Sequence, residues 1–205
     1  MRNEKDMRSL WFPRKGGGCS LAAVRRGVPH LVDLRTMQQV DLKDLYDCAL
    51  TRSLEECRYI GSGVVIYFLD PNLIEIGSGC ELRDYSILEV GGRLKIGAGS
   101  VVGAYNWFQA SGNIKIGDGV LSGPYTAFVS TEHEKPGNSG ALRDTPLRTG
   151  TVTIENNVWI GAHVSVLMNV TIGANTTIGT GSVVTRSIPT GAVAYGSPCR
   201  PVSAR

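Results

Sequence analysis

A six-residue repeat in the second half of the chain constrains the fold more than any other feature of the sequence. Five consecutive hexads open with an aliphatic residue, at Ile154, Ile160, Val166, Ile172 and Ile178. Four of the five carry Val or Thr at the fifth position, and the last carries Ser there. A period of six does not fit an amphipathic helix, which needs apolar residues every 3.6 positions. It fits a short strand followed by a turn, repeated along the chain.

The same repeat occurs upstream in a longer form. Three segments of 20 residues open with Ile-Gly at Ile76, Ile96 and Ile116, and each holds three hexads plus two residues. Three flat strands joined by corners make one coil of a triangular prism, with inward aliphatic side chains stacked about 4.8 Å apart. The 26 glycines, nearly double the usual share of about 7%, supply the backbone freedom that corners need. The sequence therefore predicts an all-β fold, a parallel β-helix.

Composition and periodicity divide the chain into three parts. Residues 1–38 are basic, contain a glycine run and lack sustained periodicity, so we expect an irregular tail. Residues 39–58 are expected to form a short helical extension, with a helix from Asp41, its N-cap, to about Cys57. Residues 59–205 are expected to form the β-helix domain.

One segment interrupts the repeat. The hexad at 128–133 is followed by a stretch rich in Pro, Gly, Asn and Ser, and the register returns only at Ile154. We expect residues 134–150 to leave the prism as a loop, with His133 at its root. A long loop expelled from a regular solenoid is a candidate functional element.

Charge and composition argue against several classes of partner. A formal net charge of +3 is too small to indicate nucleic acid. No apolar stretch is long enough for an integral membrane segment, and the charged residues 14–15 interrupt any signal-peptide core. The five cysteines show no CxxC spacing, so we expect reduced thiols in a cytoplasmic protein.

The repeats and the segment 152–200 together resemble the hexapeptide-repeat acyltransferase superfamily, in its sugar, polysaccharide or xenobiotic O-acetyltransferase branch. The segment runs from Val-Trp-Ile-Gly through Ile-Gly-Thr-Gly-Ser-Val-Val-Thr to Gly-Ser-Pro-Cys-Arg. The resemblance covers roughly residues 60–202 and implies a left-handed β-helix, the opposite of the usual crossover hand. It also implies acetyl-CoA as the acyl donor and assembly as a homotrimer.

The resemblance also implies roles for particular residues. His133 matches a general base that removes the acceptor hydroxyl's proton, for which imidazole, with a reference pKa of about 6.5, is well suited. Asn106 matches an active-site asparagine of galactoside-type enzymes, which contacts the acceptor or orients the histidine. A CoA groove between two subunits is implied for Trp159, Ala162, Thr180, Thr185, Arg186 and Arg200. Within it, the arginines fit the phosphates, and the backbone N–H near Ala162 is placed for the oxyanion.

The predicted function is an acetyl-CoA-dependent O-acetyltransferase acting on a hydroxyl of a sugar or polysaccharide precursor. Two alternatives stay open: an O-acetyltransferase for antibiotic hydroxyls, and a non-catalytic β-helix scaffold. No metal is expected, because His30, His133 and His163 are too scattered for the zinc pattern of carbonic anhydrases that share this solenoid. The acidic substrate contact of galactoside-type enzymes has no counterpart in the hexad at 108–113, so the acceptor stays undefined.

Overall fold

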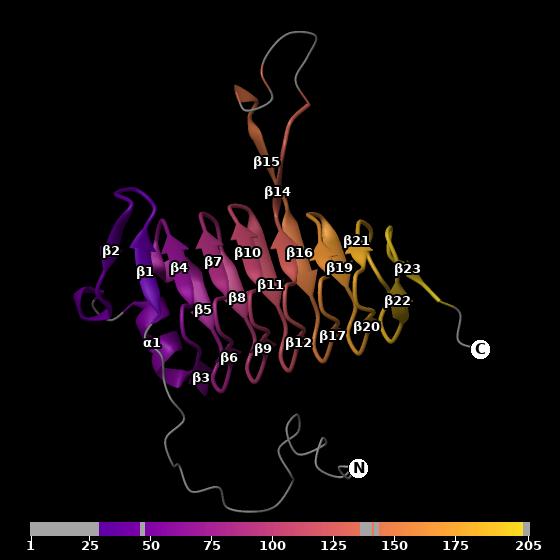
Figure 1. Cartoon of the computed structure of the whole chain (residues 1–205), viewed down its shortest axis with the longest axis horizontal. Helices are drawn as coiled ribbons and strands as arrows, with labels where there is room; N and C mark the ends of the chain where they lie inside the picture. The colour runs from indigo at the N-terminus through magenta and orange to yellow at the C-terminus, as the bar shows by residue number, and fades with distance from the viewer. Residues whose placement is uncertain (1–28, 46–47, 136–140, 142–143, 203–205) are drawn as a thin grey trace, which may run out of the picture.

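The computed structural model describes residues 29–45, 48–135, 141 and 144–202. The chain winds into an elongated prism whose coils stack along the long axis, with one hairpin projecting from an edge (Figure 1). Three sheets form the sides of the prism, and a separate two-stranded sheet forms the hairpin.

The side called sheet A here has eight strands. In spatial order they are β2 (Gln38–Val40), β1 (His30–Asp33), β4 (Val65–Phe68), β7 (Ile87–Val90), β10 (Trp107–Ala110), β13 (Ala127–Val129), β18 (Ser165–Val166) and β21 (Val183–Val184). Neighbouring strands are parallel except β1 and β2, which are antiparallel.

Sheets B and C form the other two sides. Sheet B contains β3 (Tyr59–Ile60), β6 (Glu81–Leu82), β9 (Val101–Val102), β12 (Leu121–Ser122), β17 (Trp159–Ile160), β20 (Thr177–Ile178), β22 (Val193–Tyr195) and β23 (Arg200–Pro201). Sheet C contains β5 (Ile74–Ile76), β8 (Leu94–Ile96), β11 (Asn113–Ile116), β16 (Thr151–Ile154) and β19 (Val170–Ile172). All their pairs are parallel except β22 and β23.

The hexad register decides which side chains form the core. Ile154 and Ile172 open their hexads, are fully buried and pair directly across neighbouring strands. The rings of Phe108 and Phe128 stack inside the prism with their centroids 4.5 Å apart. Successive coils thus bury equivalent residues on one another, which removes apolar surface from water along the whole axis. The predicted left-handed parallel β-helix is confirmed.

The corner that leads from sheet B to sheet A carries a row of rings. The four residues of this row have left-handed backbones with φ between 53° and 58°: Tyr85, Tyr105, Tyr125 and His163. That conformation is unfavourable for residues with a Cβ. Neighbouring rings stack with centroids 5.1, 4.9 and 4.8 Å apart, and this contact offsets part of the cost.

The N-terminal part differs from the sequence prediction. Residues 30–38, expected to be irregular, include β1 and the start of β2, and β1 continues sheet A beyond β4. Residues 1–28 of the predicted tail lie outside the described residues. The helix expected from Asp41 begins eight residues later as α1 (Ala49–Glu56), after a 3-10 turn, η2 (Leu42–Asp44). Leu50 and Leu54 of α1 are buried against the first coil, which begins with β3 and includes a second 3-10 turn, η3 (Pro71–Leu73).

The interruption of the repeat is a two-stranded arm. β14 (Thr131–His133) and β15 (Leu147–Thr149) are antiparallel partners that project from the corner between sheets A and C (Figure 1). The Gly150 N–H donates to the Ser130 carbonyl oxygen at 2.8 Å and closes the neck of the arm. The excursion therefore starts three residues before the predicted loop 134–150, and His133 lies on the arm itself.

Candidate functional site

His133 is the last residue of β14 and has an exposed side chain. Its Nδ1 lies 3.3 Å from the carbonyl oxygen of Thr145 and 3.4 Å from the Thr145 hydroxyl, on the returning side of the arm. When Nδ1 carries the proton it donates to the carbonyl, and Nε2 is left with a free lone pair. This contact favours the tautomer that a general base requires.

Polar contacts hold the arm against sheet A. The Thr131 hydroxyl donates to Gln109 Oε1 at 2.7 Å, and Gln109 Nε2 donates to the Ser111 hydroxyl at 3.0 Å. Further out, Arg148 and Glu132 form an ion pair at 3.1 Å with both side chains more than half exposed, so its contribution is small. The root of the arm therefore positions β14, and the Thr145 contacts orient the His133 ring on it.

Asn106 lies inside the prism, 1% exposed. Its Nδ2 donates to the Ser122 hydroxyl at 2.7 Å, and its Oδ1 accepts from the Thr126 N–H at 2.8 Å. It precedes β10 at the start of sheet A, whereas the arm leaves at the opposite edge of that sheet. In the single chain the Asn106 amide links coils and does not contact His133, so its predicted role at the acceptor stays a prediction.

Three of the predicted CoA residues lie in or directly after strands of sheet B. Trp159 opens β17 with 55% of its side chain exposed. Ala162 and Thr180 follow β17 and β20 on adjacent coils, where Gly161 allows close packing. A Cβ on Gly161 would lie 2.6 Å from the Thr180 backbone nitrogen. The glycine therefore sets the spacing of the two coils at this corner.

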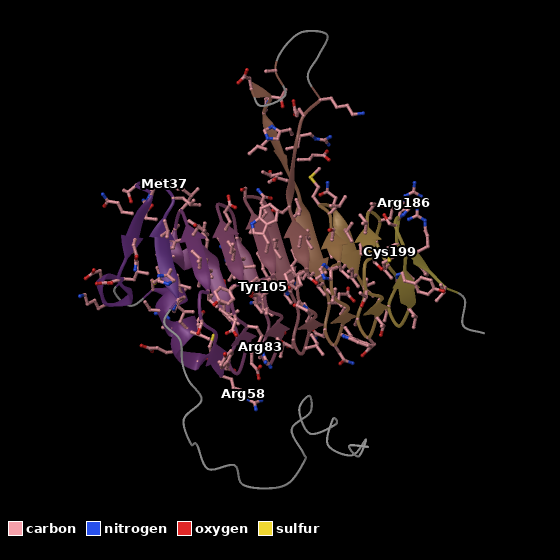
Figure 2. All side chains as sticks on the ribbon, viewed as in Figure 1. Met37, Arg58, Arg83, Tyr105, Arg186 and Cys199 are labelled. Atoms are coloured by element: carbon pink, nitrogen blue, oxygen red, sulfur yellow. The ribbon has the colours of Figure 1, made fainter. Side chains whose placement is uncertain are left out.

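The other three CoA residues lie elsewhere on the C-terminal coils. Thr185 and Arg186 are exposed after β21, and Figure 2 shows Arg186 on the edge from which the arm also projects. Arg200 opens β23, is exposed, and donates through Nη1 to the Cys199 carbonyl oxygen at 2.8 Å. The six predicted CoA residues are thus distributed over two corners and the C-terminal strand. One chain does not bring them into a single pocket.

Thiols and metal ligands contribute no further reactive centre to the described residues. The cysteines at 48, 57, 80 and 199 are buried and form no disulfide with one another, and burial raises the pKa of the Cys80 and Cys199 thiols. Cys19 lies outside the described residues. Among the residues with defined positions, no cluster of three His, Cys, Asp or Glu side chains is arranged to hold a metal ion. In the same part of the chain, no helix is long and apolar enough to cross a membrane.

Comparison with known proteins matches the C-terminal coils to a family. Residues 151–186 match the model described as bacterial transferase hexapeptide (six repeats). Galactoside O-acetyltransferase of Escherichia coli K12 is 59% identical over 49 residues, which are 24% of each chain. The enzyme of the same name from Lactococcus lactis is 58% identical over 48 residues, 23% of each chain. The matched part spans about a quarter of the length of these relatives.

Solved structures match over a longer stretch. AntD, an N-acyltransferase from Bacillus cereus in complex with dTDP and 3-hydroxybutyryl-CoA, is 25% identical, with a TM-score of 0.60 over 73% of this chain and 81% of its own. A hexapeptide-repeat acetyltransferase from Vibrio cholerae complexed with acetyl-CoA is 27% identical, with a TM-score of 0.58 over 64% and 70%. A maltose O-acetyltransferase from Clostridium difficile is 28% identical, with a TM-score of 0.51 over 71% and 66%.

The stacked coils and the hexad repeat define a left-handed β-helix protein with one projecting arm. Together with the matches, they confirm the resemblance predicted from the sequence. The repeat and fold resemble those of the hexapeptide-repeat acyltransferase superfamily.

Proposed function

We propose that the protein transfers an acetyl group from acetyl-CoA to a hydroxyl of a sugar or polysaccharide precursor, with His133 as general base. The observation that carries this proposal is the contact of His133 Nδ1 with the Thr145 carbonyl at 3.3 Å. It leaves Nε2 available to accept a proton on an arm exposed to an incoming substrate. Matches to acetyltransferases and to acyltransferase structures with CoA support the donor.

The proposed reaction is a direct transfer. His133 Nε2 removes the proton as the acceptor oxygen attacks the thioester carbonyl, and the N–H near Ala162 stabilises the oxyanion. The carbon–sulfur bond then breaks, and CoA leaves as a thiol with the proton returned by the imidazolium. The raised pKa of the buried Cys80 and Cys199 thiols favours this route over an acyl-cysteine intermediate on either residue.

The donor is proposed to bind on the C-terminal side of the arm. Arg186 and Arg200 are exposed guanidinium groups that fit the phosphates of CoA, and Trp159, Ala162, Thr180 and Thr185 complete the proposed groove. The separation of these residues over two corners supports a groove closed by a neighbouring subunit. We therefore propose a homotrimer, in the cytoplasm where acetyl-CoA is available.

The outer faces of the prism support this assembly. Sheet C presents charges to solvent, including Glu75 with its partners Arg93 and Lys95. Sheet B presents Trp159 and Val193, 55% and 50% exposed, on its C-terminal coils, whereas its Glu81, paired with Arg58 and Arg83, lies on an early coil. An apolar face beside a polar one is expected where copies associate.

A thiol-release assay with acetyl-CoA and a panel of glycans, small alcohols and antibiotics tests the proposal. His133→Ala should lower kcat by roughly 10²–10⁴-fold, the usual worth of a positioned general base, with little change in CoA affinity. His30→Ala is the matched control, because His30 is an exposed histidine on β1. Full kcat in His133→Ala contradicts the role of the base. If acetyl is transferred to antibiotics alone, the acceptor is an antibiotic hydroxyl rather than a sugar. If the protein does not bind CoA, the alternative of a non-catalytic scaffold is favoured.

A further inference from the structure

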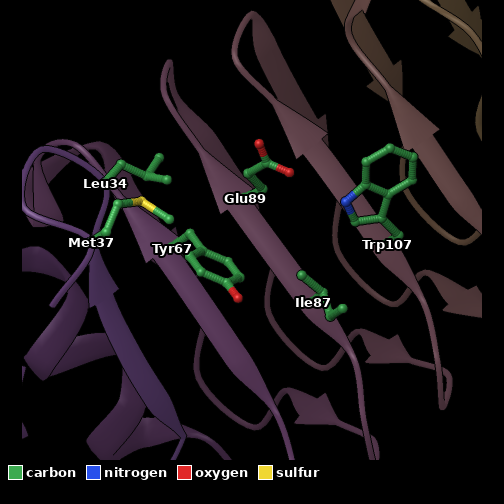
Figure 3. Close-up of a pocket in the computed structure, with 6 residues that line it drawn as sticks. All are labelled: Leu34, Met37, Tyr67, Ile87, Glu89 and Trp107. Carbon is green, nitrogen blue, oxygen red and sulfur yellow. The ribbon is translucent and has the colours of Figure 1, made fainter. Parts of the chain in front are cut away.

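The outer face of sheet A carries a groove near the N-terminal end of the prism (Figure 3). Its volume is about 330 Å³, and it is lined by Leu34, Met37, Tyr67, Ile87, Glu89 and Trp107. Tyr67, Glu89 and Trp107 come from the successive strands β4, β7 and β10. Leu34 and Met37 come from the turn between β1 and β2 and form one end of the groove.

The groove combines aromatic surface with one carboxylate. Trp107 is 41% exposed, and Tyr67 lies two strands away on the same face. Glu89 lies on β7, the strand between those of Tyr67 and Trp107. It forms no ion pair with any residue whose position is described. The lining includes no Lys, Arg or His. Aromatic rings pack against the C–H face of a sugar ring, and a carboxylate accepts hydrogen bonds from the sugar hydroxyls. The lining of the groove therefore matches a neutral carbohydrate.

The groove is connected to the arm through one residue. Gln109 pairs with Glu89 on one side and with Val129 on the other, and its side chain accepts from Thr131 at the root of the arm. Two strand spacings and four residues of strand separate Glu89 from His133, which corresponds to about 16 Å at the usual spacings. A single sugar ring does not span that distance, whereas a chain of several sugars does.

We propose that this groove binds the distal units of an extended, neutral glycan whose reacting hydroxyl lies at His133. The inference rests on the proposed acyltransferase function and narrows its acceptor to an oligosaccharide or polysaccharide. Sugar rings stack on Trp107 and Tyr67, and their hydroxyls donate to Glu89. The groove then selects acceptors by chain length.

A protein partner fits this groove less well than a glycan does. Covering Glu89 with an apolar protein face would bury a carboxylate without a partner, which is costly. A glycan brings hydroxyl donors to the same carboxylate and keeps the rest of its surface in water. The Glu89 carboxylate, which has no ion-pair partner among the described residues, therefore favours the sugar.

Binding to an array of neutral mono- to octasaccharides, measured with the full chain, tests the proposal. Affinity should rise with chain length and should fall at least tenfold in Trp107→Ala and in Glu89→Gln. Trp107→Phe should restore most of the binding, because it keeps an aromatic face. Lys115→Ala, an exposed change on sheet C, is the matched control and should bind like the wild type.

The outcomes separate the groove from the proposed function. Lack of oligosaccharide binding by the wild type, or unchanged binding in Trp107→Ala, overturns the groove, while loss of transfer in His133→Ala still supports the enzyme. Length-dependent binding without any transfer supports the groove and contradicts the proposed activity. A change of mass in Trp107→Ala, measured by light scattering, means that the groove lies between copies and overturns the proposal.

Discussion

The Thr131 hydroxyl and the Gln109 side-chain carbonyl lie 2.7 Å apart, where the arm leaves sheet A. One residue belongs to the arm and the other to β10, so this bond joins the element that carries His133 to the rigid solenoid. Gln109 also pairs with Glu89 in the groove. Gln109 is not proposed to contact acetyl-CoA or the glycan. Its contacts position the arm and the groove, which are the two elements proposed to bind the glycan.

Gln109→Leu removes the acceptor of this bond while keeping the size of the side chain. We expect kcat to fall by about tenfold, which corresponds to roughly 1.4 kcal/mol, near the usual worth of one hydrogen bond. The KM for acetyl-CoA should not change, because the donor is proposed on the C-terminal side of the arm. Thr131→Val removes the donor of the same bond and should lower kcat by a similar factor. An unchanged kcat in both variants would show that the bond does not position His133.

Asn106→Ala tests whether that residue serves the fold or the reaction. The change removes the acceptor of the Thr126 N–H and the donor to Ser122, both inside the prism. Each buried group left unsatisfied costs about 1–3 kcal/mol, so the free energy of unfolding should decrease measurably in urea titrations. The kcat per folded molecule should stay within about twofold, since the side chain cannot reach substrate. A large loss of kcat in a fully stable variant would support the catalytic role that the sequence predicts for Asn106.

Arg186→Ala and Arg200→Ala should act on the donor. Loss of a charge-assisted hydrogen bond to phosphate is worth about 1.5–3 kcal/mol, so the KM for acetyl-CoA should rise by roughly 10- to 100-fold with a smaller effect on kcat. Arg93→Ala is the control, because Arg93 directly precedes β8 of sheet C, pairs with Glu75 and is not one of the proposed CoA residues. If either arginine binds the 3′-phosphate, its effect should shrink with a donor lacking that group. Equal effects with both donors place it elsewhere.

Ile172→Asp tests the hexad register through stability. Ile172 is fully buried between Ile154 and Ile188, so the carboxylate has no partner and should cost several kcal/mol. The control is Ala174→Asn, two residues on at a half-buried corner. The control uses Asn rather than Asp, because the Ala174 N–H donates to Glu155 Oε2 at 2.8 Å. A carboxylate at position 174 would repel the Glu155 carboxylate. Urea denaturation should unfold the first variant early and leave the second within about 0.5 kcal/mol of the wild type.

The hexad register predicted the coils and the core, because an inward aliphatic residue recurs in every strand. The same register predicts that the Asn106 side chain points into the prism, because Asn106 stands at the fifth, inward place of the hexad at 102–107. Resemblance to other enzymes suggested a catalytic role that this register argues against. The hairpin of β1 and β2 was missed because its turn places Met37, rather than Gly or Asn, in the left-handed region at φ 55°.

The proposed CoA groove could not be assembled from the sequence for a different reason. Its residues were matched one by one to a motif, and a motif does not state which surfaces face each other. In the folded chain Ala162 and Arg186 lie at different corners of the prism. The two residues can line one groove only if a second copy of the chain supplies one of them. A single sequence does not show how two copies pack together.

The chain reverses direction at both ends of the prism. Sheet A ends in β2, antiparallel to β1, and sheet B ends in β23, antiparallel to β22. An open parallel coil displays unpaired backbone groups in the register of the next coil, so it is a template on which further copies can add. A short reversed strand cannot accept a parallel coil in that register. These two strands therefore oppose end-to-end addition of further copies, on sheet A at one end of the prism and on sheet B at the other.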